Sequence, residues 1–147
     1  MINLHDYLTV GQNAVVQKVV RPEDASDKYI SAFKELLSAP RLIHWSIDAA
    51  TDAIDPYLPE EYASIGTAIQ FECTAPTSVG MTITARVTIK EIGERDVLLS
   101  IEAWDEQGTI GHGTHRRMVV ETENVLNRMR ERVKTISSRR ILNWAKK

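Results

Sequence analysis

Apolar residues recur at a helical period between residues 41 and 54. Four of them are separated by four, three and four positions, which places them on one side of an α-helix: Ile43, Ile47, Ala50 and Ile54. The same stripe is widened by Leu42, Ala49 and Ala53. Ser38 and Pro40 come just before it, and these residue types favour the cap and the first turn of a helix. The pattern therefore predicts a helix that is largely covered by other elements.

After residue 59 the apolar period changes from about 3.6 residues to 2, which is typical of β-strands. The alternation predicts strands at 64–73, 81–92, 96–105 and 109–120, and a β-branched run predicts an earlier strand at 15–20. Short turn signals, Gly93-Glu94-Arg95 and Glu106-Gln107-Gly108, separate the last three strands. These three strands are therefore expected to form a meander of hairpins.

The last part of the chain returns to helical spacing, at Val125, Met129, Val133 and Ile136. We expect an amphipathic C-terminal helix that docks on the body. The order of strand, helix, antiparallel sheet and helix is that of an α+β fold. A single domain is expected over 1–147, with a core at about 10–122 and a basic helical extension at 123–147.

The composition is that of an ordinary globular domain, with 43% hydrophobic and 26% charged residues among 147. The single cysteine, Cys73, excludes an internal disulfide framework and a cysteine-based zinc site. No apolar run approaches the ~20 residues of a membrane span, and the first residues carry no leader pattern. We therefore expect a cytoplasmic protein without stable membrane insertion and without a bound metal.

The charge is unevenly distributed along the chain. Residues 124–147 carry eight basic residues and one acidic residue, whereas 1–123 carry ten basic and nineteen acidic residues. A basic tail can bind nucleic acid, but an acidic body repels phosphate backbones. The sequence therefore favours a solvated, arginine-rich helix face, and no nucleic-acid partner is expected.

Four short motifs resemble one known family. They are Pro56-Tyr57-Leu58, Ser64-Ile65-Gly66-Thr67-Ala68, Ala75-Pro76-Thr77-Ser78-Val79-Gly80-Met81 and Gly111-His112-Gly113-Thr114-His115-Arg116-Arg117. Their order and spacing are similar to those of the fluoroacetyl-CoA thioesterase-like hot-dog proteins, over about residues 10–130. The resemblance implies a hot-dog fold, in which an antiparallel sheet of about five strands wraps one long helix.

The resemblance also implies a homodimer with acyl-CoA sites at the subunit interface and no cofactor. Members of this family hydrolyse thioesters with a threonine, a glutamate and a histidine. Aligned on the shared motifs, these positions are occupied here by Ala39, Ile47 and Cys73. The departure affects the chemistry and leaves the scaffold intact.

Two sets of residues offer substitute chemistry. His44 and Asp48 are four residues apart on one helix face, so Asp48 can orient His44 as a general base, although a solvated helix face has the same pattern. The Cys73 thiolate can attack a thioester, although a lone cysteine on a strand is also an ordinary small apolar residue. No spacing of His, Asp and Glu matches a metal site.

Other residues are candidates for holding the substrate. Gly66, Thr67 and Ala68 offer backbone N–H groups to a thioester carbonyl, unless they form only a bulge. Thr74 offers a hydroxyl donor, and Phe33 belongs to a segment, 29–37, that we expect to be a short helix or lid over the acyl group. His115 and Arg116 are candidate contacts for CoA phosphates, and Arg117 is expected on a solvated face.

The sequence thus supports two hypotheses. The first is a thioesterase-like hydrolase that cleaves an acyl-CoA or acyl-carrier thioester with altered catalytic residues. The second is a non-catalytic hot-dog protein that binds acyl-CoA or a related apolar ligand.

Overall fold

The computed structural model describes residues 2–26 and 31–145. Each strand and helix expected from the apolar pattern is present, with its ends shifted by a few residues. The elements are β1 (Asn13–Val19), α1 (Ala39–Ile54), β2 (Tyr62–Cys73), β3 (Thr82–Ile92), β4 (Asp96–Asp105), β5 (Gly108–Glu121) and α2 (Thr122–Ala145).

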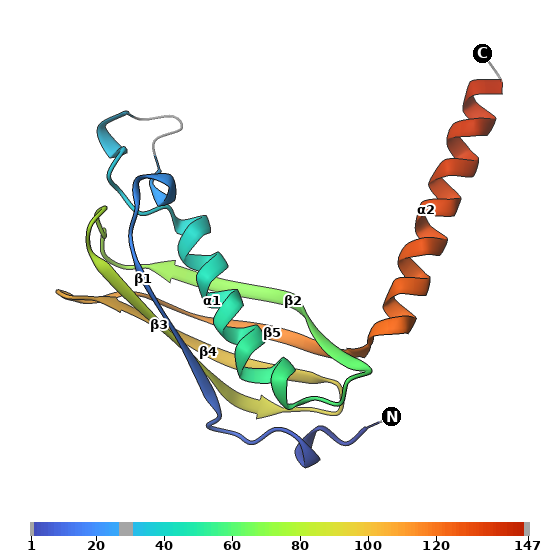
Figure 1. Cartoon of the computed structure of the whole chain (residues 1–147), viewed down its shortest axis with the longest axis horizontal. Coiled ribbons are helices and arrows are strands. Elements are labelled where there is room, and N and C mark those ends of the chain that lie inside the picture. The colour runs from blue at the N-terminus through green and yellow to red at the C-terminus, as the bar shows by residue number, and fades with distance from the viewer. Residues whose placement is uncertain (1, 27–30, 146–147) are drawn as a thin grey trace.

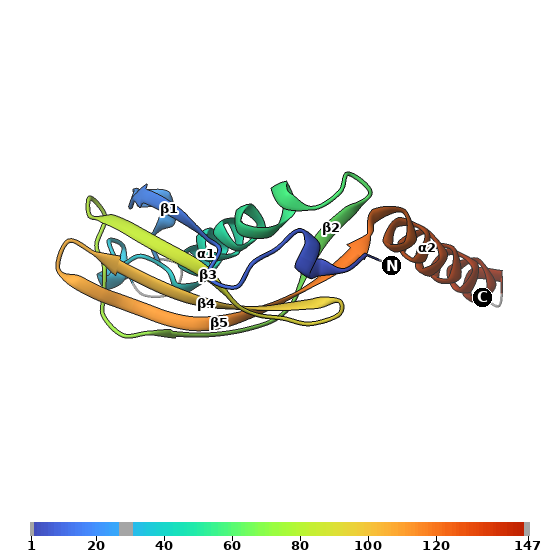
Figure 2. The same ribbon diagram turned by 90° about the horizontal axis from the view of Figure 1, so that it is seen from below.

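The five strands form one antiparallel sheet in the order β1-β3-β4-β5-β2. Strands β3, β4 and β5 are consecutive neighbours, which confirms the predicted meander. Figures 1 and 2 show α1 lying along one face of this curved sheet. The arrangement places β2 at a free edge, next to the helix that it follows in the chain.

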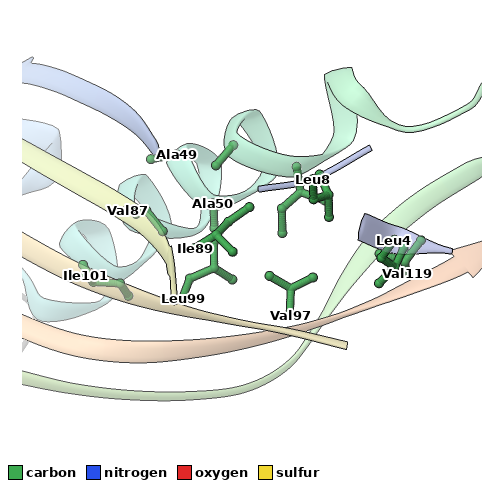
Figure 3. Close-up of a cluster of buried hydrophobic side chains, with 12 residues drawn as sticks. Leu4, Leu8, Ala49, Ala50, Val87, Ile89, Val97, Leu99, Ile101 and Val119 are labelled. Carbon is green, nitrogen blue, oxygen red and sulfur yellow. The ribbon is translucent and has the colours of Figure 1, made fainter. Parts of the chain in front are cut away.

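Helix α1 begins where the sequence predicts. The Ser38 side chain accepts a hydrogen bond from the Arg41 N–H at 3.2 Å, and proline occupies the first turn, where it loses no hydrogen bond. The helix packs on alternate residues of the sheet, among which Val87, Ile89 and Leu99 are fully buried (Figure 3). The N-terminal Leu4 and Leu8 cover the other end of the same cluster.

The buried side of α1 is rotated relative to the predicted stripe. Ile43 and Ile47 are only half-buried, and the residues against the sheet are Leu42, Trp45, Ser46, Ala49, Ala50, Ala53 and Ile54. Most of these are small, so the helix approaches the sheet closely, and Ser46 satisfies its hydroxyl by donating to the Leu42 carbonyl at 2.9 Å. The predicted residues Leu42, Ala49, Ala50, Ala53 and Ile54 are buried as expected, whereas Trp45 and Ser46 lie against the sheet in place of Ile43 and Ile47.

Strand β2 is held unusually close to β5 at its C-terminal half. A Cβ atom at Gly113 would lie 2.1 Å from the Gln70 carbonyl oxygen, and one at Gly111 would overlap the Phe71 ring at 2.7 Å. The two glycines therefore allow β2 and β5 to approach closely here. The pairing register also shifts between Gly66 and Ala68, so this segment forms a bulge near the middle of β2.

Helix α2 is present, but the prediction that it docks is wrong for the single chain. It projects away from the sheet (Figure 1), and Met129, Val133 and Ile136 are 56%, 62% and 47% exposed. An apolar period identifies the face that avoids water but not the surface that covers it. No described helix is both long enough and apolar enough to cross a bilayer.

Part of the lid expected at 29–37 lies outside the described residues, namely 29–30. The rest contains a short 3-10 helix, Ser31–Phe33, and single strand-like bridges from Leu36 to Ser78 and from Leu37 to Ala25. These bridges fix the segment, which leads into α1, against the loops that hold Ala25 and Ser78.

Candidate active site

A cleft of about 440 Å³ lies between the N-terminus of α1 and the C-terminal end of β2. Its apolar walls include Leu36, Leu37, Leu42 and Ile110. Its polar side chains are Ser26, Ser38, Cys73, Thr74 and Thr77. The stretches 36–42 and 73–77 thus converge on one hollow, together with Ser26 and Ile110.

The cleft brings together several residues that sequence reasoning selected. Ala39 and Cys73, which occupy the family's threonine and histidine positions by resemblance, both line it, and so does Thr74. Ser38 also lines the cleft, but its hydroxyl caps α1. The first turn of α1 therefore faces the cleft with the positive end of the helix dipole.

No histidine, carboxylate, lysine or arginine is among the described residues that line this cleft. The one group there that can act as a nucleophile at moderate pH is the Cys73 thiol. Partial burial raises its pKa above the ordinary value of 9.0. In the single chain Cys73 is therefore a neutral thiol, which is a weak nucleophile.

His44 and Asp48 make the contact that their spacing predicts, with 3.5 Å between His44 Nε2 and Asp48 Oδ2. Their side chains are 61% and 54% exposed on the outer face of α1, and neither lines the cleft. One protomer alone does not place this pair beside Cys73. Ile47 lies about 12 Å from Ala39 along the helix axis, at 1.5 Å per residue, and does not line the cleft.

Polar side chains from the start of β2, from β5 and from the end of α1 form a hydrogen-bonded network that the sequence did not predict. We call it the Arg117 network, and it consists of Asp55, Ser64, His115 and Arg117. Arg117 donates from Nε to Ser64 Oγ at 2.7 Å and from Nη2 to the Ser64 carbonyl at 2.8 Å. The Ser64 hydroxyl in turn donates to the Asp55 carboxylate. His115 donates from Nδ1 to the Ala68 carbonyl at 2.8 Å, so its Nε2, 3.2 Å from Arg117 Nη1, is the acceptor.

Burial determines the charge states within the Arg117 network. It lowers the pKa of His115 below 6.5; the hydrogen bond to Ala68 opposes this shift, and the positive charge of Arg117 adds to it. Burial also lowers the pKa of Arg117, which the Asp55 carboxylate counteracts. His115 is thus held neutral and in one tautomer.

The structure corrects three sequence interpretations here. His115 is 2% exposed and fully engaged, so it is not a phosphate contact in the single chain. Arg117, expected on a solvated face, is 5% exposed. Arg116 is the exposed arginine of the pair, and it forms a 2.7 Å ion pair with Asp96 on β4 rather than lying free for a ligand. Arg117 lies on the same side of β5 as the buried His115 and Val119, so the alternation of the strand places Arg117 inward and Arg116 outward.

The remaining substrate-binding candidates lie outside the cleft. Gly66, Thr67 and Ala68 lie in the bulge at the middle of β2, where the Thr67 hydroxyl donates to the Arg116 carbonyl at 3.2 Å. Phe33 is 49% exposed and lines a neighbouring hollow that shares Leu36 and Thr77 with the cleft. Phe33 therefore lies beside the cleft and does not line it.

Ile110 and Thr77 are among the cleft residues that the sequence did not single out. Ile110 reaches the cleft because β5 pairs with the end of β2, and Thr77 is held by a 2.8 Å hydrogen bond from its hydroxyl to Asp105. Both depend on strand register, and the motif Ala75–Met81 was the one local signal for Thr77. No group of three or more His, Cys, Asp or Glu side chains within the described part of the chain is arranged to hold a metal ion.

Comparison with known proteins relates this geometry to one family. The family model described as fluoroacetyl-CoA-specific thioesterase matches residues 20–123. The fluoroacetyl-CoA thioesterase of Streptantibioticus cattleyicolor is 33% identical over 91 residues, which is 62% of this chain. The match spans 63% of the length of that relative.

Solved structures agree with the fold. A hot-dog-like protein from Thermanaerovibrio acidaminovorans superposes with a TM-score of 0.84 and 27% identity, covering 89% of this chain and 97% of the other. A threonine-to-serine variant of the fluoroacetyl-CoA thioesterase in complex with acetyl-CoA gives a TM-score of 0.77 and 27% identity, with coverages of 85% and 98%. The hot-dog fold expected from the sequence is confirmed.

Proposed function

The chain belongs to the fluoroacetyl-CoA-specific thioesterase family, and we propose that it hydrolyses an acyl-CoA or carrier-bound acyl thioester in the cleft between α1 and β2. The observation that carries the proposal is the convergence of Ala39, Cys73 and Thr74 on one cleft. These positions come from two distant segments, and the family resemblance assigns two of them to the reaction. No cofactor is part of the proposal.

Thioester hydrolysis joins a water oxygen to the carbonyl carbon and releases the CoA thiol with a proton. It requires donors for the developing oxyanion and a group that accepts the proton of water. The first turn of α1 and the Thr74 hydroxyl are suited to the first task, because both face the cleft. The neutral side chains of this cleft do not supply the second.

A second protomer is therefore part of the proposal. Strand β2 is a free edge of twelve residues, with Ile65 and Ile69 41% and 38% exposed. Long apolar edges of this kind are covered in native proteins. We infer a homodimer in which two β2 edges pair, so that each cleft lies beside the other subunit.

In such a dimer the two α1 helices lie antiparallel on one continuous sheet. The middle of one helix then approaches the N-terminal end of the other. This arrangement favours His44, oriented by Asp48, as the base that serves the neighbouring cleft. His44 is suited to the role because imidazole titrates near neutral pH.

A second function, acyl-CoA binding without hydrolysis, is favoured by one specific observation. The Cys73 thiol has a raised pKa and no basic neighbour in its own cleft. A cleft of this kind holds an apolar acyl group without activating a nucleophile.

One experiment separates the two functions. The protein is incubated with short-, medium- and aryl-acyl-CoAs, and loss of each thioester is followed by chromatography. Hydrolysis that is abolished in His44→Ala but retained in His112→Ala, whose exposed histidine also contacts a carboxylate at 3.6 Å, supports the proposed mechanism. If Cys73→Ser also abolishes hydrolysis, the thiol takes part in the mechanism together with His44.

Thermal stabilisation by acyl-CoA without any hydrolysis supports the binding function, since a ligand of the folded state raises its stability. Absence of both hydrolysis and binding contradicts both functions. The cytoplasmic location expected from the sequence stays a prediction, which fractionation of cells producing the full chain checks.

A further inference from the structure

A second hollow, of about 520 Å³, lies where α2 leaves the sheet. Its walls come from the start of β2, the end of β5, the turn between β3 and β4, and the first turns of α2. Met118 and Val125 supply an apolar floor, and Asn127 contributes an amide. The hollow also receives two arginines, Arg95 from the turn and Arg128 from α2.

Both guanidinium groups are available to an anion. Among the described residues, no carboxylate forms an ion pair with Arg95 or Arg128. The one carboxylate in the hollow, Glu121, instead accepts hydrogen bonds from the Tyr62 hydroxyl at 3.3 Å and the Asn124 amide at 3.0 Å. Two unpaired guanidiniums above an apolar floor suit a phosphorylated ligand, because each can donate two parallel hydrogen bonds to the oxygens of one phosphate.

The position of the hollow relates it to the thioester cleft of a second subunit. Tyr62, at the start of β2, pairs with Glu121, the last residue of β5. Helix α2 begins directly after Glu121 (Figure 1). Antiparallel pairing of two β2 edges over their full length brings Tyr62 of one chain beside Cys73 of the other. The hollow of one subunit and the cleft of the other then lie at the same end of the joined sheet.

We propose that Arg95 and Arg128 bind the nucleotide phosphates of a CoA molecule whose thioester lies in the cleft of the second subunit. CoA carries its thioester at one end and its phosphates at the other, so both sites can hold one molecule. The proposal rests on the proposed function and on the β2 pairing. Helix α2 lies largely beyond the matched residues 20–123, so Arg128 is a feature of this chain rather than of the family match.

The test compares two double variants by titration calorimetry. Arg95→Gln with Arg128→Gln removes the two guanidiniums of the hollow, whereas Arg132→Gln with Arg139→Gln removes the same charge from exposed positions of α2. The probes are CoA, adenosine 3′,5′-bisphosphate and inorganic phosphate. We expect the first variant to bind CoA and the bisphosphate about 10-fold more weakly, and the control to bind them within about twofold of the parent protein.

Four results would overturn the proposal. They are no binding of either nucleotide by the parent protein, equal losses in both variants, an effect confined to inorganic phosphate, and dissociation of a dimer by the first variant alone. Turnover separates this proposal from the hydrolase function. If CoA binding depends on the two arginines but no thioester is hydrolysed, the hydrolase function is refuted and the phosphate site is supported. If the first variant hydrolyses acyl-CoA with an unchanged KM, the hydrolase function is supported and the phosphate site is refuted.

Discussion

Replacing Arg117 by methionine tests the Arg117 network most sharply. The side chain is 5% exposed and donates to Ser64 Oγ, the Ser64 carbonyl and His115 Nε2. Methionine keeps the length of the stem but leaves the carbonyl and the imidazole nitrogen without a donor. Each unsatisfied buried acceptor costs about 1–3 kcal/mol, and release of the buried charge offsets part of this. We expect a net loss of about 2–4 kcal/mol.

Arg116→Met is the matched control. The neighbouring arginine is exposed and pairs with Asp96 at the surface, where such pairs contribute about 0–1 kcal/mol. Urea unfolding of the two variants, followed by circular dichroism, gives the comparison. A thermal scan should give the same ranking. At about 2–4 °C per kcal/mol, the unfolding midpoint of Arg117→Met should fall by about 4–16 °C. Equal losses in both variants, or a larger loss for Arg116→Met, would refute the assignment of the inward arginine.

Three further predictions concern other parts of the molecule. Because the pKa of His115 is lowered in the folded state, the unfolded chain binds a proton at this histidine more readily. The contribution of neutral His115 to the free energy of unfolding is therefore present above pH 6.5 and is lost as the pH falls through the folded pKa. His115→Gln should flatten this part of the pH dependence measured by urea unfolding, and an unchanged slope would contradict the burial argument. Gly113→Ala forces a Cβ onto the Gln70 carbonyl and should lower the thermal midpoint by several degrees, whereas a parent-like midpoint would show that β2 and β5 separate easily. Deletion of residues after Val133 should leave CoA binding within about twofold in calorimetry, since the binding residues precede it, and a larger loss would assign the rest of α2 to the site.

The strands and the central helix were predictable because each has a clear apolar period. The alternation in β3 places Ile83, Ala85, Val87 and Ile89 on the buried side, as the structure confirms. For α1 the apolar period predicts five of the seven buried residues and misses Trp45 and Ser46, because Ile43 and Ile47 share the helical spacing but lie at the margin of the buried face. The free face of α2 has the same period as a docked one, so its exposure was not predictable.

The candidate site was predictable only in part. Resemblance selected Ala39 and Cys73, and the structure places both at one cleft. Helical spacing alone gave the contact between His44 and Asp48, but not its distance from that cleft. The inward side of Arg117 follows from its alternation with Val119 in β5, whereas its contact with Ser64 depends on pairing between distant segments.

The most direct test of the account is a crystal structure with a thioether analogue of an acyl-CoA, which cannot be hydrolysed. The account predicts a dimer paired through β2, with the acyl end between Ala39 and Cys73 and a second subunit closing the cleft. A monomer, or an analogue bound away from the α1–β2 cleft, would contradict it.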